Sequence, residues 1–193
     1  MNSGFFAGVR VRGAAAIVLA AGLSACGGPA DAPQVSAKAA KAPAAPAFDF
    51  EKWIAANAGC KGDYIADLQD AQFAQRLREA GVDIGEDSSV GEVGVGSGTL
   101  KPGRPARLHG FPVKQVTYFF DSGAMFAVQV EASAEQARAA IGAKPLPAVY
   151  REEYTEGVPT AEASENVPMP DIQFVRAGEQ PGTQEIGCAA FDG

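Results

Sequence analysis

Apolar residues recur with helical spacing early in the chain. Between residues 63 and 80 they fall at i, i+4 and i+7, namely Phe73, Leu77 and Ala80. This spacing is typical of a helix that buries one face. A second range, 49–58, carries aromatic and aliphatic residues on one side, and both ranges begin with Asp, a preferred N-cap. We therefore expect helices over 49–58 and 63–80, with a break near Asp70 as an alternative.

Further along, the spacing changes to strict alternation. Every second position is apolar on both sides of 121–123, the positions being Val116, Tyr118, Phe120, Phe126, Val128 and Val130. Two alternating runs joined by a short glycine-containing turn predict a β-hairpin. A second hairpin is expected from 172–176 and 186–190. Between the two hairpins, Ser133 and Gln136 have the spacing of a capping box and predict a short helix.

These elements give the order α-β-β-α-β-β. We expect an α+β fold in which an antiparallel sheet of two β-hairpins carries helices on one face, because a parallel sheet needs a crossover between strands. Residues 27–47 are rich in Ala and Pro and hold almost no bulky apolar residue. Such a stretch predicts a flexible spacer. The expected organisation is a leader over 1–25, a linker over 26–47 and one domain over 48–193.

The leader has the three parts of a secretory signal. Arg10 and Arg12 precede an apolar run over 13–22, and the run ends in Leu23-Ser24-Ala25-Cys26. The run is shorter than the roughly 20 residues that a membrane-spanning helix needs. The segment resembles the signal of bacterial lipoproteins, and its last four residues match their lipobox. An ordinary cleaved signal followed by a chance cysteine is the alternative interpretation.

The resemblance implies a mature chain that begins at Cys26 and is lipidated on both its sulfur and its new amino group. Three acyl chains would hold it on a membrane, since one chain alone binds only marginally. Gly27 stands where aspartate marks inner-membrane retention in enterobacterial lipoproteins. We therefore expect anchoring in the outer membrane, facing the periplasm, with the inner membrane as the alternative.

Charge restricts the class of partner. The formal charge is −7, and loss of Arg10 and Arg12 with the leader makes it −9. Nucleic-acid binding depends on Lys and Arg that neutralise phosphates, so no nucleic acid is expected. A basic envelope protein is compatible with this charge, as is plain solubility.

Two cysteines remain once Cys26 is lipidated. An even pair in an oxidising compartment predicts a disulfide between Cys60 and Cys188, with two free thiols as the alternative. The chain contains no Cys-x-x-Cys spacing and only one histidine, His109. We therefore expect neither a thioredoxin-type redox site nor a metal or other cofactor.

Three patterns suggest chemistry only weakly. The glycines at 91, 94, 96 and 98 are not followed by the helix that a nucleotide-binding loop requires, so a flexible loop or irregular hairpin is expected and no nucleotide. His109 could serve a catalytic triad with Ser97 or Ser122, but neither serine lies in a nucleophile elbow. Three aspartates, Asp63, Asp67 and Asp70, lack the EF-hand spacing and are expected on a solvated helix face.

The segment 144–170 has few strongly apolar residues and many acidic ones. A loop of this length is commonly disordered or functional, and both readings stay open. If ordered, it is a candidate partner-binding surface in which aromatic anchors and carboxylates act together. The candidate residues are Tyr150, Glu152, Glu153, Tyr154 and Glu156.

No set of residues predicts catalysis clearly. We expect a membrane-anchored periplasmic lipoprotein that acts as a non-enzymatic binding or envelope accessory module. The alternatives are a cell-wall or glycan hydrolase that uses carboxylates, and a purely structural envelope protein.

Overall fold

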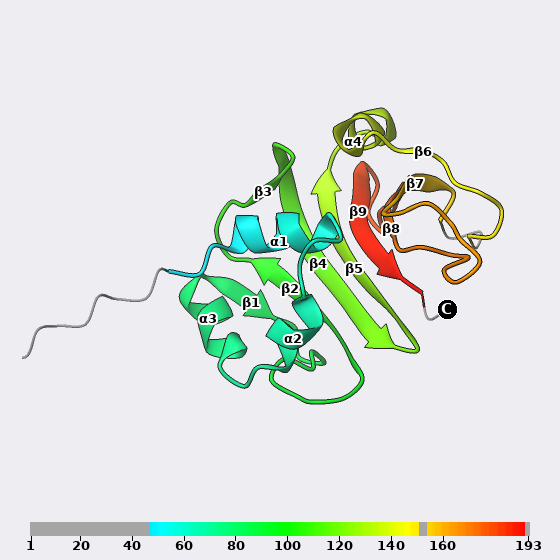
Figure 1. The fold of residues 1–193 in the computed structure, drawn as a ribbon. Coiled ribbons are helices and arrows are strands. Elements are labelled where there is room, and N and C mark those ends of the chain that lie inside the picture. The colour runs from blue at the N-terminus through cyan, green and yellow to red at the C-terminus, as the bar shows by residue number, and fades with distance from the viewer. Residues whose placement is uncertain (1–46, 151–153, 192–193) are drawn as a thin grey trace, which may run out of the picture. The chain divides into compact units, whose positions relative to one another are not determined.

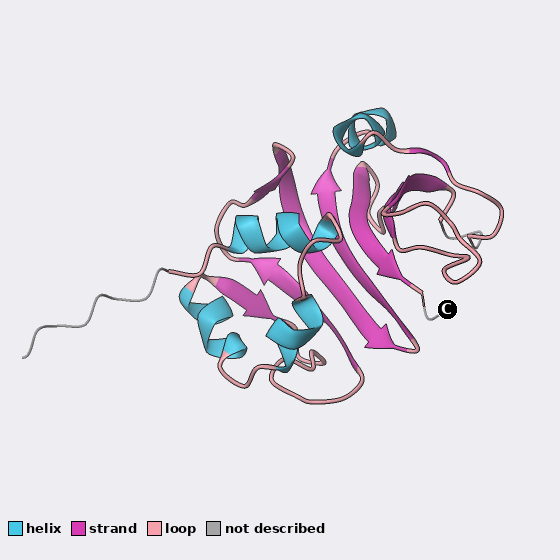
Figure 2. Ribbon diagram, viewed as in Figure 1, coloured by secondary structure: helices cyan, strands magenta, loops and turns pink. Residues whose placement is uncertain are grey.

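The computed structural model describes residues 47–150 and 154–191, in which helices cover an antiparallel sheet (Figures 1 and 2). The helices are α1 (Phe50–Ala58), α2 (Tyr64–Gln69), α3 (Phe73–Glu79) and α4 (Ala134–Ile141). The strands are β1 (Val82–Ile84), β2 (Gly96–Pro102), β3 (Arg107–Leu108), β4 (Phe111–Asp121), β5 (Gly123–Glu131), β6 (Lys144–Pro145), β7 (Glu156–Pro159), β8 (Ile172–Ala177) and β9 (Thr183–Ala190). The predicted α+β class is confirmed.

The sheet order is β1-β2-β4-β5-β9-β8-β7-β6, with β3 paired to β4. The two predicted hairpins correspond to β4–β5 and β8–β9, which β5 and β9 join by pairing directly with each other. The element order differs from α-β-β-α-β-β because α2 and α3 are separate helices and five further strands form. Three of those strands, β1, β3 and β6, have only two or three residues, too few for an alternating pattern to emerge.

The helices begin where the sequence predicts. The side chain of Asp49 accepts a hydrogen bond from the Lys52 amide at 3.0 Å, and that of Asp63 accepts one from the Ala66 amide at 3.2 Å. A continuous helix over 63–80 is wrong, and the alternative of a break near Asp70 holds, since this residue is extended (ψ 119°) between α2 and α3. The capping box at the start of α4 is present as well. None of the helices in the described ranges is long and apolar enough to cross a membrane.

One face of the sheet carries the main core. All four helices contribute buried residues to it, and Figure 1 shows α1 lying across the central strands. Trp53 of α1 lies at the centre, with its ring centroid 5.2 Å from Phe73 and 5.1 Å from Phe126. Its indole N–H donates to Asp67 at 2.7 Å, which satisfies the polar atom of a buried ring.

Strand β2 contains the glycines that suggested a loop. Ideal Cβ atoms at Gly96 and Gly98 would lie 2.3 Å from the Phe120 ring and 2.5 Å from the Tyr118 hydroxyl. These two glycines therefore leave room for aromatic side chains of β4, the cross-strand partner. Of the four glycines of the 91–98 pattern, only Gly91 and Gly94 have positive φ, and both lie before the strand. The expected flexible loop is thus wrong for 96–102, where the chain forms a strand; the alternative of an irregular hairpin agrees with the antiparallel pairing of β1 and β2 across residues 85–95.

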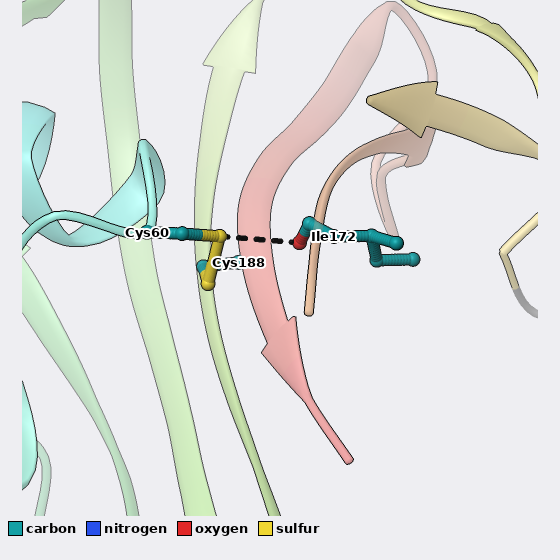
Figure 3. Close-up of a disulfide and its surroundings, with 3 residues drawn as sticks. All are labelled: Cys60, Ile172 and Cys188. Carbon is teal, nitrogen blue, oxygen red and sulfur yellow. Dashed lines mark hydrogen bonds between the residues drawn. A yellow bond between two sulfur atoms is a disulfide. The ribbon is translucent and has the colours of Figure 1, made fainter. Parts of the chain in front are cut away.

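The predicted disulfide joins the helical layer to the sheet (Figure 3). Cys60, just after α1, is bonded to Cys188 of β9, with their Cα atoms 5.2 Å apart and a sequence separation of 128. The Cys60 sulfur also lies 3.3 Å from the carbonyl oxygen of Ile172 on β8. A disulfide sulfur has no proton to donate, so this is a packing contact. The cross-link therefore holds α1 against the centre of the sheet.

Candidate functional site

The predicted partner-binding residues do not form one exposed surface. Tyr150 and Tyr154 are only 6% and 7% exposed, so in this structure they are packing residues and offer little area to a partner. Glu156 lies on β7 and pairs with Arg138 of α4 at 2.9 Å. Glu152 and Glu153 fall outside the described residues.

The two tyrosines instead cover the second face of the sheet. Together with Ala127, Ile172, Phe174 and Ala189 they form a separate buried cluster. The Tyr150 hydroxyl donates to the Pro170 carbonyl at 3.1 Å, and burial, together with the nearby charge of Asp171, raises the pKa of this phenol. The described parts of the 144–170 segment thus act as a cover over β8 and β9. Phe119 of β4 and Ser97 of β2 remain exposed on the same face.

The side chains of the second face form cross-strand rows that run from the covered part to an exposed part. One row runs from the buried Ile172 and Ala189 through Met125 to the exposed Phe119 and Ser97, across β8, β9, β5, β4 and β2. Phe119 is 44% exposed although the residues before and after it are buried. Strand alternation explains the contrast, because it turns Tyr118 and Phe120 to the core and Phe119 to the open face.

Arg176 extends along this open face from β8. Its Nε donates to Oε2 of Glu185 on β9 at 2.6 Å, and its Nη2 lies 3.3 Å from the Met125 sulfur. The guanidinium carbon lies 5.3 Å from the ring centroid of Phe174 and 5.8 Å from that of Tyr154. Both rings offer their faces at a distance where cation–π attraction operates. The side chain is therefore held at several points.

These residues surround a hollow of about 370 Å³, which we call the Arg176 hollow. Its wall is rich in rings and thioethers, and its lining residues are Phe119, Ser122, Gly123, Ala124, Met125, Tyr154, Met169, Arg176, Ala189, Ala190 and Phe191. Arg, Tyr, Phe and Met are the residue types that protein interfaces favour. The hollow, with the exposed Phe119 in its wall, is the candidate functional site.

The triad pattern is not assembled. His109 lies in the turn before β4, with φ 51°, whereas Ser122 follows the other end of that strand. Strand β4 has 11 residues, so the two side chains are separated by roughly 30 Å. Ser97 pairs with Phe119 and is likewise near the distant end of β4. His109 is thus a turn residue.

The three aspartates of the first helical region have structural partners. Asp63 caps α2, Asp67 accepts from Trp53, and Asp70 pairs with Arg76. Within the ranges that the structure describes, no group of three or more His, Cys, Asp or Glu residues could hold a metal ion.

The sequence did contain a pattern that indicates the open face, namely an aromatic residue at an outward strand position, but the acidic segment 144–170 was selected as the candidate site instead. Phe119 stands at a polar position of an alternating run whose other phase, Val116, Tyr118 and Phe120, is buried. An aromatic residue at an outward position of a strand is unusual when the strand has one solvated face. No family model matches the chain, and searches of curated proteins and of solved structures found no match.

Proposed function

We propose that the chain is a lipid-anchored, periplasmic binding module whose recognition surface is the open sheet face around Phe119. The protein would be attached to the outer membrane through Cys26 and would bind an envelope protein without chemical turnover. The observation that carries the binding proposal is the exposed Phe119 in the wall of the Arg176 hollow. A large aromatic side chain next to a concave, ring-lined surface is the usual composition of an interface hot spot.

The proposed location has two independent supports. The lipobox ends at Cys26, and the remaining cysteines, Cys60 and Cys188, lie at disulfide distance. Structural disulfides persist in oxidising compartments and are rare in the cytosol. Export across the inner membrane accounts for both features.

The acidic composition supports a basic partner. The mature chain would carry a formal charge of −9, since the leader removes two arginines and no acidic residue. Complementary charge raises association rates and disfavours acidic competitors.

Site-specific photo-crosslinking tests the binding surface. A benzoylphenylalanine residue placed at position 119 of the full chain, in its own membranes, should give a discrete light-dependent adduct. The same residue at Val167 is the matched control, because Val167 is 49% exposed and lies outside the hollow. We expect the adduct at 119 to disappear when Met125→Asp is added. Equal adducts at both positions, or none at 119, would contradict the proposal.

A further inference from the structure

We infer that the Arg176 hollow receives one large apolar side chain, preferably aromatic, from a basic polypeptide. This inference rests on the proposed function and specifies the chemistry of the partner. Three properties of the hollow support it: Arg176 is already paired with a carboxylate of the chain, the lining includes rings and thioethers, and the chain around it carries negative charge.

The cation of the hollow is already neutralised. Arg176 pairs at 2.6 Å with Glu185, whose side chain is only 9% exposed. Its remaining described contacts are the Met125 sulfur and two aromatic rings. An anionic ligand would therefore meet no net positive charge, and it would have to lose water without electrostatic compensation. The hollow is not an anion site.

The lining offers rings and thioethers alongside polar atoms, and the small size suits one inserted side chain. Phe119, Tyr154 and Phe191 contribute rings, and Met125 and Met169 contribute thioethers. A volume of about 370 Å³ lies at the small end of ligand pockets, which start near roughly 300 Å³. Thioethers adapt to the shape of a guest and make favourable contacts with aromatic rings. One large side chain fits this description better than an extended ligand.

An exposed carboxylate beside the hollow and the negative formal charge of the chain favour a basic partner. Asp121 is exposed and directly precedes Ser122, which lines the hollow. None of the four ion pairs among residues 47–150 and 154–191 includes Asp121. Lysine or arginine residues flanking the inserted side chain would supply the complementary charge.

The methionine content provides a selective probe. The chain has three methionines, of which Met1 belongs to the leader and the other two, Met125 and Met169, both line the hollow. Carbon-13 labelling of methionine methyl groups in the full mature lipoprotein, held in detergent micelles, therefore gives two reporters at the site. The probes are three blocked peptides, Lys-Lys-Trp-Lys-Lys, Lys-Lys-Ala-Lys-Lys and Glu-Glu-Trp-Glu-Glu.

We expect the Lys-Trp peptide to shift both methyl signals saturably. Replacing its Trp by Ala, or its Lys residues by Glu, should weaken the apparent affinity by about tenfold or more, a size typical of a lost hot-spot side chain. In the protein, Phe119→Ser should weaken binding by about fivefold or more, whereas Val167→Ser, the matched control, should change it by less than about twofold. Equal binding of the Ala peptide, equal binding of the Glu peptide, or no shift with any peptide would overturn the inference.

The crosslinking and peptide experiments distinguish failure of the proposed binding surface from failure of the inferred partner chemistry. A crosslink at position 119 together with a preference for the Glu peptide would retain the binding surface and reject the basic partner. Saturable shifts with the Lys-Trp peptide but no crosslink would show that the hollow has the inferred chemistry while the envelope supplies no partner at that face.

Discussion

Arg176 and Glu185 form an ion pair across β8 and β9 that is enclosed by side chains. They are direct cross-strand partners, and the two side chains are 30% and 9% exposed. The guanidinium lies over Phe174 and Tyr154 and contacts Met125, so one cation connects the covered part of the sheet to its open face. The shape of the hollow depends on this arrangement.

Glu185→Gln should lower the free energy of unfolding by about 1–3 kcal/mol, because it leaves a half-buried guanidinium without its counter-charge. The pair Lys114–Glu131 is a solvent-exposed control, with side chains 41% and 50% exposed. There, Glu131→Gln should cost less than about 1 kcal/mol, the usual limit for surface pairs. Urea unfolding measures both changes. Equal losses in the two variants would show that enclosure does not strengthen the Arg176 pair.

Removing the cross-link should destabilise the domain. We expect Cys60→Ser with Cys188→Ser to lose about 2–5 kcal/mol of unfolding free energy, since the disulfide closes a 128-residue separation and limits the unfolded chain. Denaturant midpoints of the variant and of the parent with and without reductant measure the effect. The reduced parent should resemble the double variant. An oxidised parent no more stable than the double variant would contradict a stabilising role for the disulfide.

Gly96→Ala should be destabilising by about 1–3 kcal/mol, because the added methyl group would overlap the Phe120 ring. Ser97→Ala, one residue along on the exposed face of the same strand, is the control and should change stability by less than about 0.5 kcal/mol. Thermal or urea unfolding separates the two. A tolerated alanine at 96 would mean that Phe120 can repack freely.

His109 should make stability depend on pH. Burial lowers the pKa of this imidazole in the folded chain. The unfolded chain therefore binds the proton more tightly, so stability present above the ordinary value of about 6.5 should fall as the pH drops below it. His109→Asn removes the titrating group, and Asn tolerates the left-handed φ of 51° that this turn requires.

Urea midpoints of both chains at about pH 8 and about pH 5 isolate this contribution, because all other groups titrate alike in the two chains. The variant should lose less stability on acidification than the parent. Parallel changes in the two chains would show that His109 does not contribute.

Local signals predicted the helices and the central hairpins. The caps at Asp49, Asp63 and Ser133 act through bonds to residues three positions away, so their sequence spacing is sufficient to identify them. Strands β1, β2, β6 and β7 depend instead on distant partners. Gly96 pairs with Phe120, whose ring occupies the space that a Cβ at 96 would need, and nothing near Gly96 in sequence shows this.

The candidate site was harder to predict for the same reason. Tyr150 and Tyr154 have the sequence context of an acidic loop, yet the fold packs them over Phe174 and Phe191. Composition does not reveal that the sheet has a second apolar surface in need of cover. Phe119 could have been identified as outward-facing from the alternation of β4. Its proximity to Arg176 could not, because it follows from the order in which β4, β5, β9 and β8 pair.

Every proposal on location and partner requires that Cys26 becomes a lipidated amino terminus. Intact-mass measurement of the chain extracted from membranes tests this most directly. We predict a polypeptide that begins at Cys26 and carries the added mass of three acyl chains, and we predict that Cys26→Ser abolishes this species. An unmodified chain that begins at Met1 and is recovered from the cytosol would contradict the account.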